Sequence, residues 1–416
     1  MSQWRRYSKY KSSVVEWLGE VPKEWEQSRL RFLCSITTGS KNTEDSDPTG
    51  QYPFFVRADT VERLHTFSFN EEAILTAGDG AGVAKVFHYY NGKFDAHQRV
   101  YVLTRFKGIL PKFLFLYFRQ NLGDEVLKLS AKSTVESLRL PMLQNFPVLI
   151  PPFPEQHSIF SFLNIETARI DTIIEKKERQ IELLQEKRAS LIYQAVTKGI
   201  DPNVKMKESG IEWIGEVPEH WEILKNKWIY QEIDERSTTG KEELLTVSHI
   251  TGVTPRSEKD VNMFLPLSFE GYKLCKKDDL AINTMWAFMG ALGFSPCDGM
   301  VSPSYNIYRL KNRCVSKYFD YLYRTPAFIG EILRHSKGVW TSRLRLYPDE
   351  FLSIVSMIPP VDEQKKIVEH IDSIIENEKI QIGKIRHSID LLKEYRTALI
   401  SAAVMGKIDV RGESVS

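Results

Sequence analysis

The feature that most constrains the fold of this chain is an internal repeat. Residues 16–22 return as residues 212–218 with a single changed position. Residues 150–156 and 358–364 both begin Ile-Pro-Pro and both end Glu-Gln. Because a repeat of this kind fixes architecture before any single motif is interpreted, we expect one structural unit to occur twice in the chain.

Between the shared blocks the two halves differ. Residues 27–149 and 223–357 have little in common apart from the tripeptide Leu-Arg-Leu, found at 138–140 and again at 344–346. Similar repeated blocks around dissimilar inserts suggest that the chain performs the same task twice, on different targets. A duplicated enzyme would instead repeat its active site.

Length and composition indicate a globular protein with more than one domain. The chain has 416 residues, of which 42% are hydrophobic and 26% charged, which is typical of globular proteins. Neither a secretory signal, a transit peptide nor an apolar run of the roughly 20 residues that cross a bilayer is present, so we expect a cytoplasmic protein without a membrane segment. The four cysteines are scattered, without the spacing of a disulfide framework or a zinc site.

Two segments have the composition and periodicity of long helices. Residues 155–198 contain no proline or glycine, and their apolar residues recur three and four positions apart, although Arg188 interrupts this seam. Residues 361–410 carry a matching stripe. Each segment follows a Pro-Pro pair, and proline disfavours helix in the residue before it. We expect two helices, residues 153–201 and 361–410, that form an antiparallel coiled coil.

Such helices have a length that suits DNA. About thirty-five helical residues extend ~50 Å, somewhat more than the ~34–36 Å turn that separates half-sites in two-headed DNA-binding proteins. Periodicity alone would favour an ordinary helix pair in a two-domain scaffold. The repeat on either side of the helices favours a spacer.

The inserts have the mixed pattern of an α/β (α+β) fold. Short β-branched runs at residues 52–56, 83–90 and 100–103 are separated by turn signals. The pair Asn91-Gly92 predicts a hairpin turn, which would bring together Lys85, His88 and Lys93. A solvated hairpin without function fits the same residues.

Each insert also contains basic and hydroxyl side chains suited to DNA. Lysine and arginine neutralise phosphates, arginine can bind guanine through two hydrogen bonds, and hydroxyls can donate to phosphates or base edges. In the first half the candidate DNA-binding residues are Lys85, His97, Arg99, Lys132, Ser133, Thr134 and Arg139. In the second half they are Ser304, Lys337, Trp340, Thr341, Arg343 and Arg345. A basic loop is often only a solvated surface, but its occurrence in both halves favours a function.

The sequence shows no catalytic or cofactor-binding motif. Pro151-Pro152-Phe153 lacks the preceding Asn or Asp of amino-methyltransferases, and residues 78–82 are not followed by the Gly-Lys-Ser/Thr of a phosphate-binding loop. Acidic pairs such as Glu71-Glu72 lie among polar residues without nuclease spacing. We therefore expect no catalytic residue, no metal and no cofactor in this chain.

Taken together, these motifs resemble the specificity subunits of type I restriction-modification systems. The resemblance is carried by residues 17–22 with Trp25, by the two Ile-Pro-Pro blocks that lead to Glu-Gln, and by Lys-Gly-Ile-Asp at the end of the first helix. The second helix ends instead with Gly-Lys-Ile-Asp. The similarity covers nearly the whole chain.

The resemblance implies a non-catalytic subunit that binds double-stranded DNA. Its two target-recognition domains, residues 1–152 and 202–360, would each read half of a split site, and their dissimilarity implies an asymmetric site. Two methyltransferase subunits would bind the spacer helices, residues 153–201 and 361–410, and restriction/translocase subunits would join them. S-adenosylmethionine, ATP and Mg²⁺ would belong to those partners. The alternatives are a coiled-coil scaffold that never touches DNA and a self-contained DNA methyltransferase or nuclease.

Overall fold

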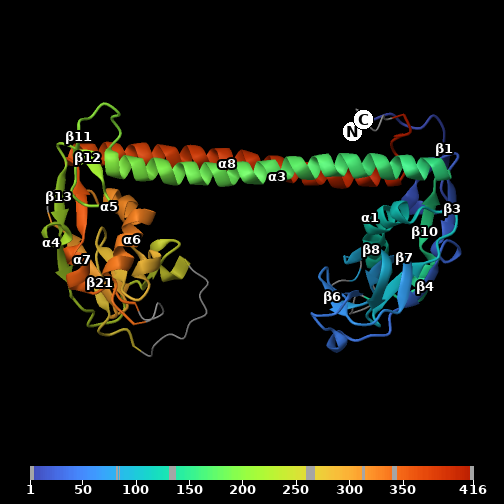
Figure 1. Ribbon diagram of the computed structural model, residues 1–416, viewed down its shortest axis with the longest axis horizontal. Helices are drawn as coiled ribbons and strands as arrows, with labels where there is room; N and C mark the ends of the chain where they lie inside the picture. Colours follow the sequence, from blue (N-terminus) through green and yellow to red (C-terminus); the bar gives the residue numbers. More distant parts are fainter. Residues whose placement is uncertain are drawn as a thin grey trace. The chain divides into compact units, whose positions relative to one another are not determined.

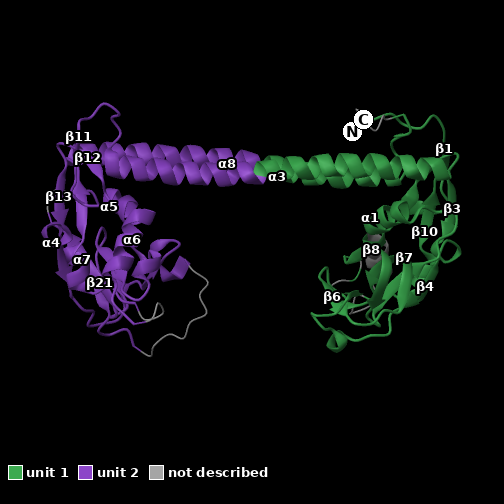
Figure 2. Cartoon of the chain, viewed as in Figure 1, with its two compact units in different colours: residues 1–177, 386–416 green, residues 178–385 purple. Residues whose placement is uncertain are grey.

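The structure is a computed structural model that divides the chain into two compact units (Figure 2). It describes residues 4–80, 83, 85–130, 137–258, 268–311, 314–339 and 344–412, with side chains from 124 to 130 left undescribed. Unit 1 comprises Met1–Lys177 with Arg386–Ser416, and unit 2 comprises Glu178–Ile385. The four-segment division predicted from the sequence cuts the chain at other points and stays a prediction.

Two long helices (Figure 1) each contribute residues to both units (Figure 2). Helix α3 spans Phe153–Lys198 and helix α8 spans Val361–Val404, and each begins directly after a Pro-Pro pair, as predicted. With 46 and 44 residues, they exceed the thirty-five residues used to estimate the spacer length, and both end before the predicted boundaries at residues 201 and 410. Gly199 has a φ of 77°, a conformation that favours glycine, and α3 ends just before it at Lys198, three residues before the predicted boundary.

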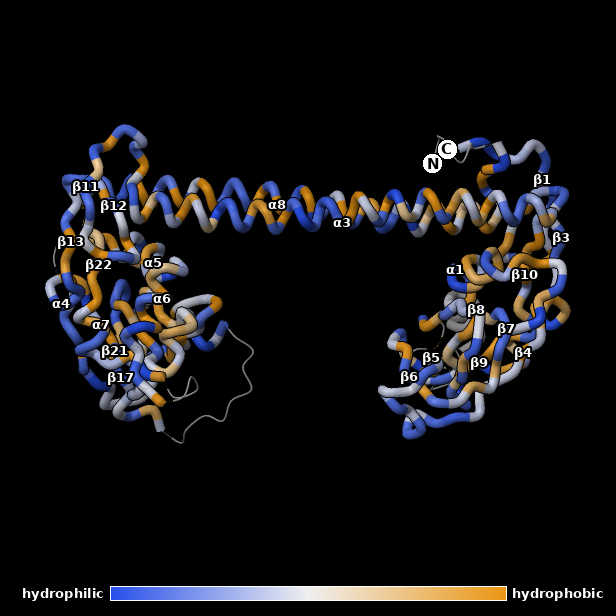
Figure 3. Tube along the Cα trace, in the orientation of Figure 1, coloured by the Kyte–Doolittle hydropathy of each residue, from blue (hydrophilic) through white to orange (hydrophobic). Residues whose placement is uncertain are grey.

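Within each unit, parts of the two helices pack side by side. In unit 1 the guanidinium of Arg396 binds Asp171 through hydrogen bonds of 2.9 and 3.2 Å. In unit 2, Arg188, which interrupts the apolar seam, donates to the buried Glu378 across 2.9 Å. In unit 1 an early part of α3 meets a late part of α8, and in unit 2 the reverse holds, so the pairing is antiparallel in both. Figure 3 shows hydrophobic and hydrophilic stretches alternating along both helices.

The centre of unit 1 is a six-stranded sheet. Its order is β4-β9-β7-β8-β5-β6, with all neighbours antiparallel except β5 and β8. The strands are Ser35–Thr38 (β4), Val100–Thr104 (β9), Phe69–Ala77 (β7), Phe87–Ala96 (β8), Tyr52–Phe55 (β5) and Val61–Leu64 (β6). Helix α1, Pro111–Ser130, packs on one face and buries Phe113, Tyr117 and Phe118 together with Ile74 and Leu103.

Unit 2 contains a smaller antiparallel sheet of the order β14-β21-β18-β19. The strands are Tyr230–Ile233 (β14), Tyr305–Leu310 (β21), Leu280–Asn283 (β18) and Leu292–Phe294 (β19). Helices α5 (Ser316–Tyr323) and α6 (Pro326–His335) pack against it, with Phe319 and Phe328 buried beside Leu280. Two strand pairs complete the unit: β15 (Leu245–Ser248) with β16 (Gly252–Pro255), and β17 (Lys273–Cys275) with β20 (Gly299–Val301). Both units are therefore mixed α+β, as predicted.

The repeated sequence blocks form a second set of strands, which we call the frame. In unit 1 the frame strands are β1 (Tyr10–Ser12) with β2 (Glu20–Pro22) and β3 (Glu26–Arg29) with β10 (Pro147–Ile150). In unit 2 they are β11 (Met206–Glu208) with β12 (Glu216–Pro218) and β13 (Glu222–Lys225) with β22 (Val355–Ile358). The registers are equivalent, since Glu26 faces Ile150 as Glu222 faces Ile358.

The repeated tryptophan and glutamate join the frame to the long helices. Trp25 Nε1 donates to Glu155 Oε1 across 3.0 Å, and Trp221 Nε1 donates to Glu363 Oε1 across 3.1 Å. Both indoles are fully buried, so each needs a partner for its N–H group. These repeated residues therefore have an architectural role.

The repeated glutamine has the same kind of role. Gln156 Oε1 accepts a hydrogen bond from the backbone N–H of Leu110 across 2.6 Å, and Gln364 Oε1 accepts one from Val315 across 2.8 Å. Each glutamine also donates to the carbonyl of the first proline of its pair, across 2.9 and 2.8 Å. The motif Ile-Pro-Pro with Glu-Gln thus ties each helix start to the segment before α1 or α5.

The hairpin turn predicted at Asn91-Gly92 is wrong. Strand β8 continues through this pair, with Asn91 opposite Glu72 and Gly92 opposite Glu71 in β7. Burial of Phe94 on the same strand outweighs the local turn preference. His88 instead lies 3.1 Å from the carbonyl of Ala58, and Lys93 lies over the ring of Phe67, so the predicted basic cluster does not form.

Among the described residues, no helix is long and apolar enough to cross a membrane. In the same residues, no three His, Cys, Asp or Glu side chains gather in a way that could hold a metal ion.

Candidate nucleic-acid interface

In unit 1, three segments meet where strand β7 ends. The backbone N–H of Gly78, directly after β7, donates to the carbonyl of Arg99 across 2.8 Å. The carbonyl of Gly78 in turn accepts from the N–H of Leu138 across 2.9 Å. Leu138 precedes helix α2, Leu140–Asn145, and Arg99 precedes β9. We call Gly78, Asp79, Gln98, Arg99, Ser137 and Arg139 the strand-end surface of unit 1.

Unit 2 joins the equivalent three segments where strand β18 ends. The hydroxyl of Thr284, directly after β18, donates to the carbonyl of Ser304 across 3.0 Å. The carbonyl of Thr284 accepts from the N–H of Leu346 across 3.0 Å. Leu346 precedes helix α7, Pro348–Ser353, and Ser304 precedes β21. We call Thr284, Met285, Trp286, Ser304, Arg345 and Tyr347 the strand-end surface of unit 2.

The turns before β9 and β21 have the same geometry. In unit 1, the N–H of Val100 donates to the carbonyl of His97 across 2.9 Å, and in unit 2, the N–H of Tyr305 donates to the carbonyl of Ser302 across 3.0 Å. Arg99 and Ser304 are therefore equivalent positions. The sequence selected both as DNA-binding candidates without indicating this equivalence.

An aspartate holds two arginines on the surface of unit 1. Asp79 accepts Arg57 Nη1 at Oδ1 and Arg99 Nη1 at Oδ2, both across 3.0 Å. Both arginines are exposed, and a guanidinium has five N–H donors, so each keeps donors for another acceptor. The strand-end surface also borders a cavity of about 310 Å³, whose walls include Arg99 and Arg139. Two of the predicted residues therefore face one space.

The remaining candidates of the first half have other positions. His97 is buried, its Nδ1 accepts the N–H of Arg99 across 3.0 Å, and its pKa is lowered by burial and by Arg57 nearby. His97 thus shapes the turn that presents Arg99. Lys85 is exposed between β7 and β8. Lys132, Ser133 and Thr134 lie outside the described residues.

In the second half, Lys337 and Arg345 lie side by side. The backbone of each donates to the carbonyl of the other across 2.9 Å, and both side chains are exposed. The Nζ of Lys337 forms an ion pair with Glu350, and this hydrogen bond raises the pKa of Lys337. Ser304 is exposed as well. Trp340, Thr341 and Arg343 lie outside the described residues.

The tripeptide match between the inserts has a different register in space. The sequence pairs Leu138-Arg139-Leu140 with Leu344-Arg345-Leu346. The structure pairs Leu138 with Leu346 by their equivalent hydrogen bonds, and Arg139 caps α2 as Tyr347 caps α7. Arg139 and Arg345 are therefore not equivalent, because the hydrogen bonds of Leu138 and Leu346 define the spatial register and the short sequence match does not.

Sequence reasoning missed several residues on or beside these surfaces. Arg57 lies two residues after strand β5 and reaches Asp79, a contact that no local pattern reveals. The segment 78–80 suggested only a turn. Met285 and Trp286 are apolar and would ordinarily be assigned to a core, yet they are 40% and 49% exposed.

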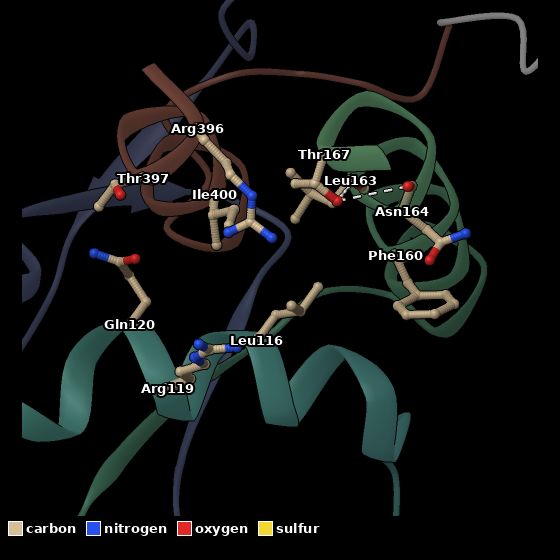
Figure 4. Close-up of a pocket in the computed structure, with 10 residues that line it drawn as sticks. All are labelled: Leu116, Arg119, Gln120, Phe160, Leu163, Asn164, Thr167, Arg396, Thr397 and Ile400. Carbon is tan, nitrogen blue, oxygen red and sulfur yellow. Dashed lines mark hydrogen bonds between the residues drawn. The ribbon is translucent and has the colours of Figure 1, made fainter. Parts of the chain in front are cut away.

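A second cavity, of about 240 Å³, lies between α1, α3 and α8 in unit 1 (Figure 4). Its polar lining consists of Arg119, Gln120, Asn164, Thr167, Arg396 and Thr397. In unit 2, Asp372 occupies the place of Asn164, counted from the repeated glutamine, and it accepts the hydroxyl of Tyr321 across 2.5 Å and Lys317 Nζ across 2.7 Å. The helical part of the two units therefore also differs in its side chains.

Comparisons with known proteins agree with this geometry. Residues 22–183 match the family model of the type I restriction modification DNA specificity domain. The resemblance predicted from the sequence is therefore confirmed for this segment. It contains β7, β9 and the whole strand-end surface of unit 1.

Curated relatives carry matching names. The specificity subunit of the type I restriction enzyme EcoDI from Escherichia coli is 30% identical over 176 residues, 42% of this chain and 38% of the relative. The specificity subunit of the type I restriction enzyme MjaVIII from Methanocaldococcus jannaschii is 26% identical over 223 residues, 50% of this chain and 49% of the relative. These alignments span less than half of the relatives. A third relative from the same organism aligns over 420 residues at 25% identity, covering 89% of this chain and 93% of its own.

Solved structures share the fold. The HsdS subunit from Thermoanaerobacter tengcongensis superposes with a TM-score of 0.54 at 14% identity, covering 93% of this chain and 98% of that one. A chain from work on the complex assembly and conformational transition of the type I R-M system superposes with a TM-score of 0.61 at 13% identity, covering 92% and 98%. At these identities the likeness concerns the fold alone.

Proposed function

We propose that this chain is a non-catalytic DNA-specificity subunit of a type I restriction-modification system, and that its two units each read one half of an asymmetric double-stranded DNA site. The observation that carries the proposal is the pair of strand-end surfaces. At or beside equivalent strand ends, unit 1 presents Arg57, Asp79 and Arg99, whereas unit 2 presents Met285 and Ser304. Equal placement with unequal side chains is what an asymmetric target requires.

The charge of the unit 1 surface supports DNA as the ligand. Arg57, Arg99 and Arg139 are exposed there, against a single aspartate that holds two of them in place. Fixed guanidinium groups bind backbone phosphates, and they can also donate to the O6 and N7 atoms of guanine in the major groove. An arginine side chain that a neighbouring carboxylate already holds in place loses less conformational entropy when DNA binds.

The long helices would serve as the spacer. We propose that α3 and α8 pair as an antiparallel coiled coil and fix the number of base pairs between the half-sites. A helix of 46 residues is about 69 Å long, so it exceeds one turn of DNA. The antiparallel contacts Arg396–Asp171 in unit 1 and Arg188–Glu378 in unit 2 support this pairing.

The chemistry would reside in partner subunits. We propose that two methyltransferase subunits bind the helices, that restriction/translocase subunits join them, and that S-adenosylmethionine, ATP and Mg²⁺ are bound by these partners in the cytoplasm. The cavity between α1, α3 and α8 is a candidate docking site for a methyltransferase subunit (Figure 4).

A selection from random DNA tests the function. The chain, co-expressed with its methyltransferase partner, is incubated with a random duplex library at moderate salt, and the retained molecules are sequenced. We expect two short, unlike motifs at a fixed gap. A stable complex that enriches no sequence would contradict the proposal and favour the scaffold alternative.

A further inference from the structure

The strand-end surface of unit 2 exposes large apolar side chains. Met285 and Trp286 follow strand β18 and are 40% and 49% exposed, and Met289 is 45% exposed. Single exposed apolar residues are ordinary in proteins, but three within five residues form a patch. No residue of this patch takes part in the core clusters of unit 2 in the described part of the chain.

Backbone hydrogen bonds hold this patch in one conformation. The N–H of Trp286 donates to the carbonyl of Asn283 across 3.0 Å, and the carbonyl of Trp286 accepts from Met289 and Ala291 across 3.0 and 3.1 Å. Gly290 closes the turn with a φ of 90°, a conformation that favours glycine. The exposed side chains therefore project from a fixed backbone, as a recognition surface requires.

Polar groups suited to DNA flank the patch. Thr284, directly before Met285, bonds to both Ser304 and Leu346, and Arg345 precedes Leu346. The hydroxyl of Ser304 and the guanidinium of Arg345 are on exposed residues. An apolar patch beside hydroxyl and guanidinium groups matches a duplex, whose grooves offer base edges between two rows of phosphates.

Unit 1 carries different chemistry at the equivalent place. Gly78 and Thr284 occupy equivalent positions after β7 and β18, so Asp79 corresponds to Met285. Asp79 holds the two guanidinium groups of Arg57 and Arg99, whereas Met285 and Trp286 offer mainly apolar surface. One strand end thus presents hydrogen-bond donors, and the other presents hydrocarbon, sulfur and an indole ring.

We propose that Met285 and Trp286 read thymine in the half-site of unit 2, by packing against its C5-methyl group in the major groove. Thymine is the only base that presents a methyl group there, and apolar side chains are the ones that contact it. This inference rests on the proposed function, since it assigns base chemistry to one of the two reading surfaces.

The test replaces thymine by uracil, which removes only the methyl group. The site is first obtained by library selection with the full chain in complex with its methyltransferase partner. Each thymine of that site is then changed to uracil, one at a time, and the dissociation constant is measured. We expect binding about four-fold weaker at one or two thymines, all in one half-site, as for the loss of one buried methyl group.

Protein variants assign the effect to the patch. In the variant Met285→Ala with Trp286→Ala, uracil should bind as well as thymine at those positions. The matched control is Ile250→Ala, an apolar residue of unit 2 that is 75% exposed, and it should keep the wild-type preference. Thermal unfolding of each variant shows whether it is folded.

The outcomes separate this inference from the function on which it rests. A bipartite site that shows no uracil effect in either half would overturn the thymine assignment and leave the specificity role intact. A double variant that loses the methyltransferase partner but keeps its uracil sensitivity would also overturn it, because the patch would then be a protein-docking surface. Failure to enrich any site would count against the proposed function itself.

Discussion

The two units share the frame, whereas their strand-end surfaces, after β7 and β18, carry different side chains. The same hydrogen bond, equal in length to within 0.1 Å, joins Trp25 to Glu155 and Trp221 to Glu363. The inserts that lie between these residues in the two halves have almost no sequence in common. At the strand ends, by contrast, Asp79 with two arginines in unit 1 corresponds to Met285 in unit 2. The difference teaches that a duplicated architecture can keep the placement of a surface constant while its chemistry changes.

The largest effect is expected when the tryptophans of the frame are replaced, which tests whether the two frames are equivalent. Trp25→Ala and Trp221→Ala should each reduce the free energy of unfolding by about 3–5 kcal/mol, because each deletes a fully buried indole. Hydrogen exchange, resolved by unit, should place the loss in unit 1 for the first variant and in unit 2 for the second. A neutral result for one of them would mean that the two frames are not equivalent.

The next largest effect should come from the arginines of unit 1. Arg57→Ala and Arg99→Ala should each weaken DNA binding by about 1–3 kcal/mol and relax the sequence preference in one half-site only. Library selection followed by sequencing measures both changes. Arg179→Ala, an exposed arginine on α3, is the control and should leave both half-sites unchanged. Equal relaxation of both half-sites would contradict separate reading.

A smaller effect is expected from unit 2. Arg345→Ala should weaken DNA binding by about 1 kcal/mol, through loss of a phosphate or base contact, while the complex with the methyltransferase stays intact. Titration at two salt concentrations measures the change. Unchanged affinity would count against a role in DNA binding for the basic segment around Lys337 and Arg345.

The spacer can be altered with little expected change in affinity. Four residues inserted between Arg188 and Leu191, with four more placed opposite in α8 near Glu378, lengthen each helix by about 6 Å. The tolerated gap between half-sites should then grow by about two base pairs, at 3.4 Å per pair. Selection from random DNA reports the gap directly, and an unaltered gap would refute the spacer role.

The sequence predicted what depends on repetition and on local rules. The duplicated frame, the start of α3 after Pro151-Pro152 and the mixed α+β inserts could be derived, because repeats and proline positions act locally. The turn at Asn91-Gly92 failed, since pairing along β7 and β8 decides the conformation there. The pairing of β7 with β8, which buries Phe94, outweighs the local preference for a turn.

The candidate site could be predicted only in part. Arg99, Arg139, Ser304 and Arg345 were found by composition and lie on the strand-end surfaces. His97 was selected for its polarity, but the fold buries it beneath Arg99. Arg57 depends on a contact across 22 positions of the chain, to Asp79, which no single-sequence pattern contains.

The core of unit 1 contains residues from before and after unit 2 in the sequence, which affects when unit 1 can fold during synthesis. The backbone N–H of Asp409 donates to the carbonyl of Arg5 across 2.8 Å, and Leu399, Ala403 and Val404 belong to the same core as Trp25. A ribosome therefore completes all of unit 2 before it makes residues on which the core of unit 1 depends. Domains usually fold in the order in which they are made. The core of unit 1 must therefore wait for residues that follow unit 2 in the chain, so its apolar side chains stay exposed while unit 2 is being made.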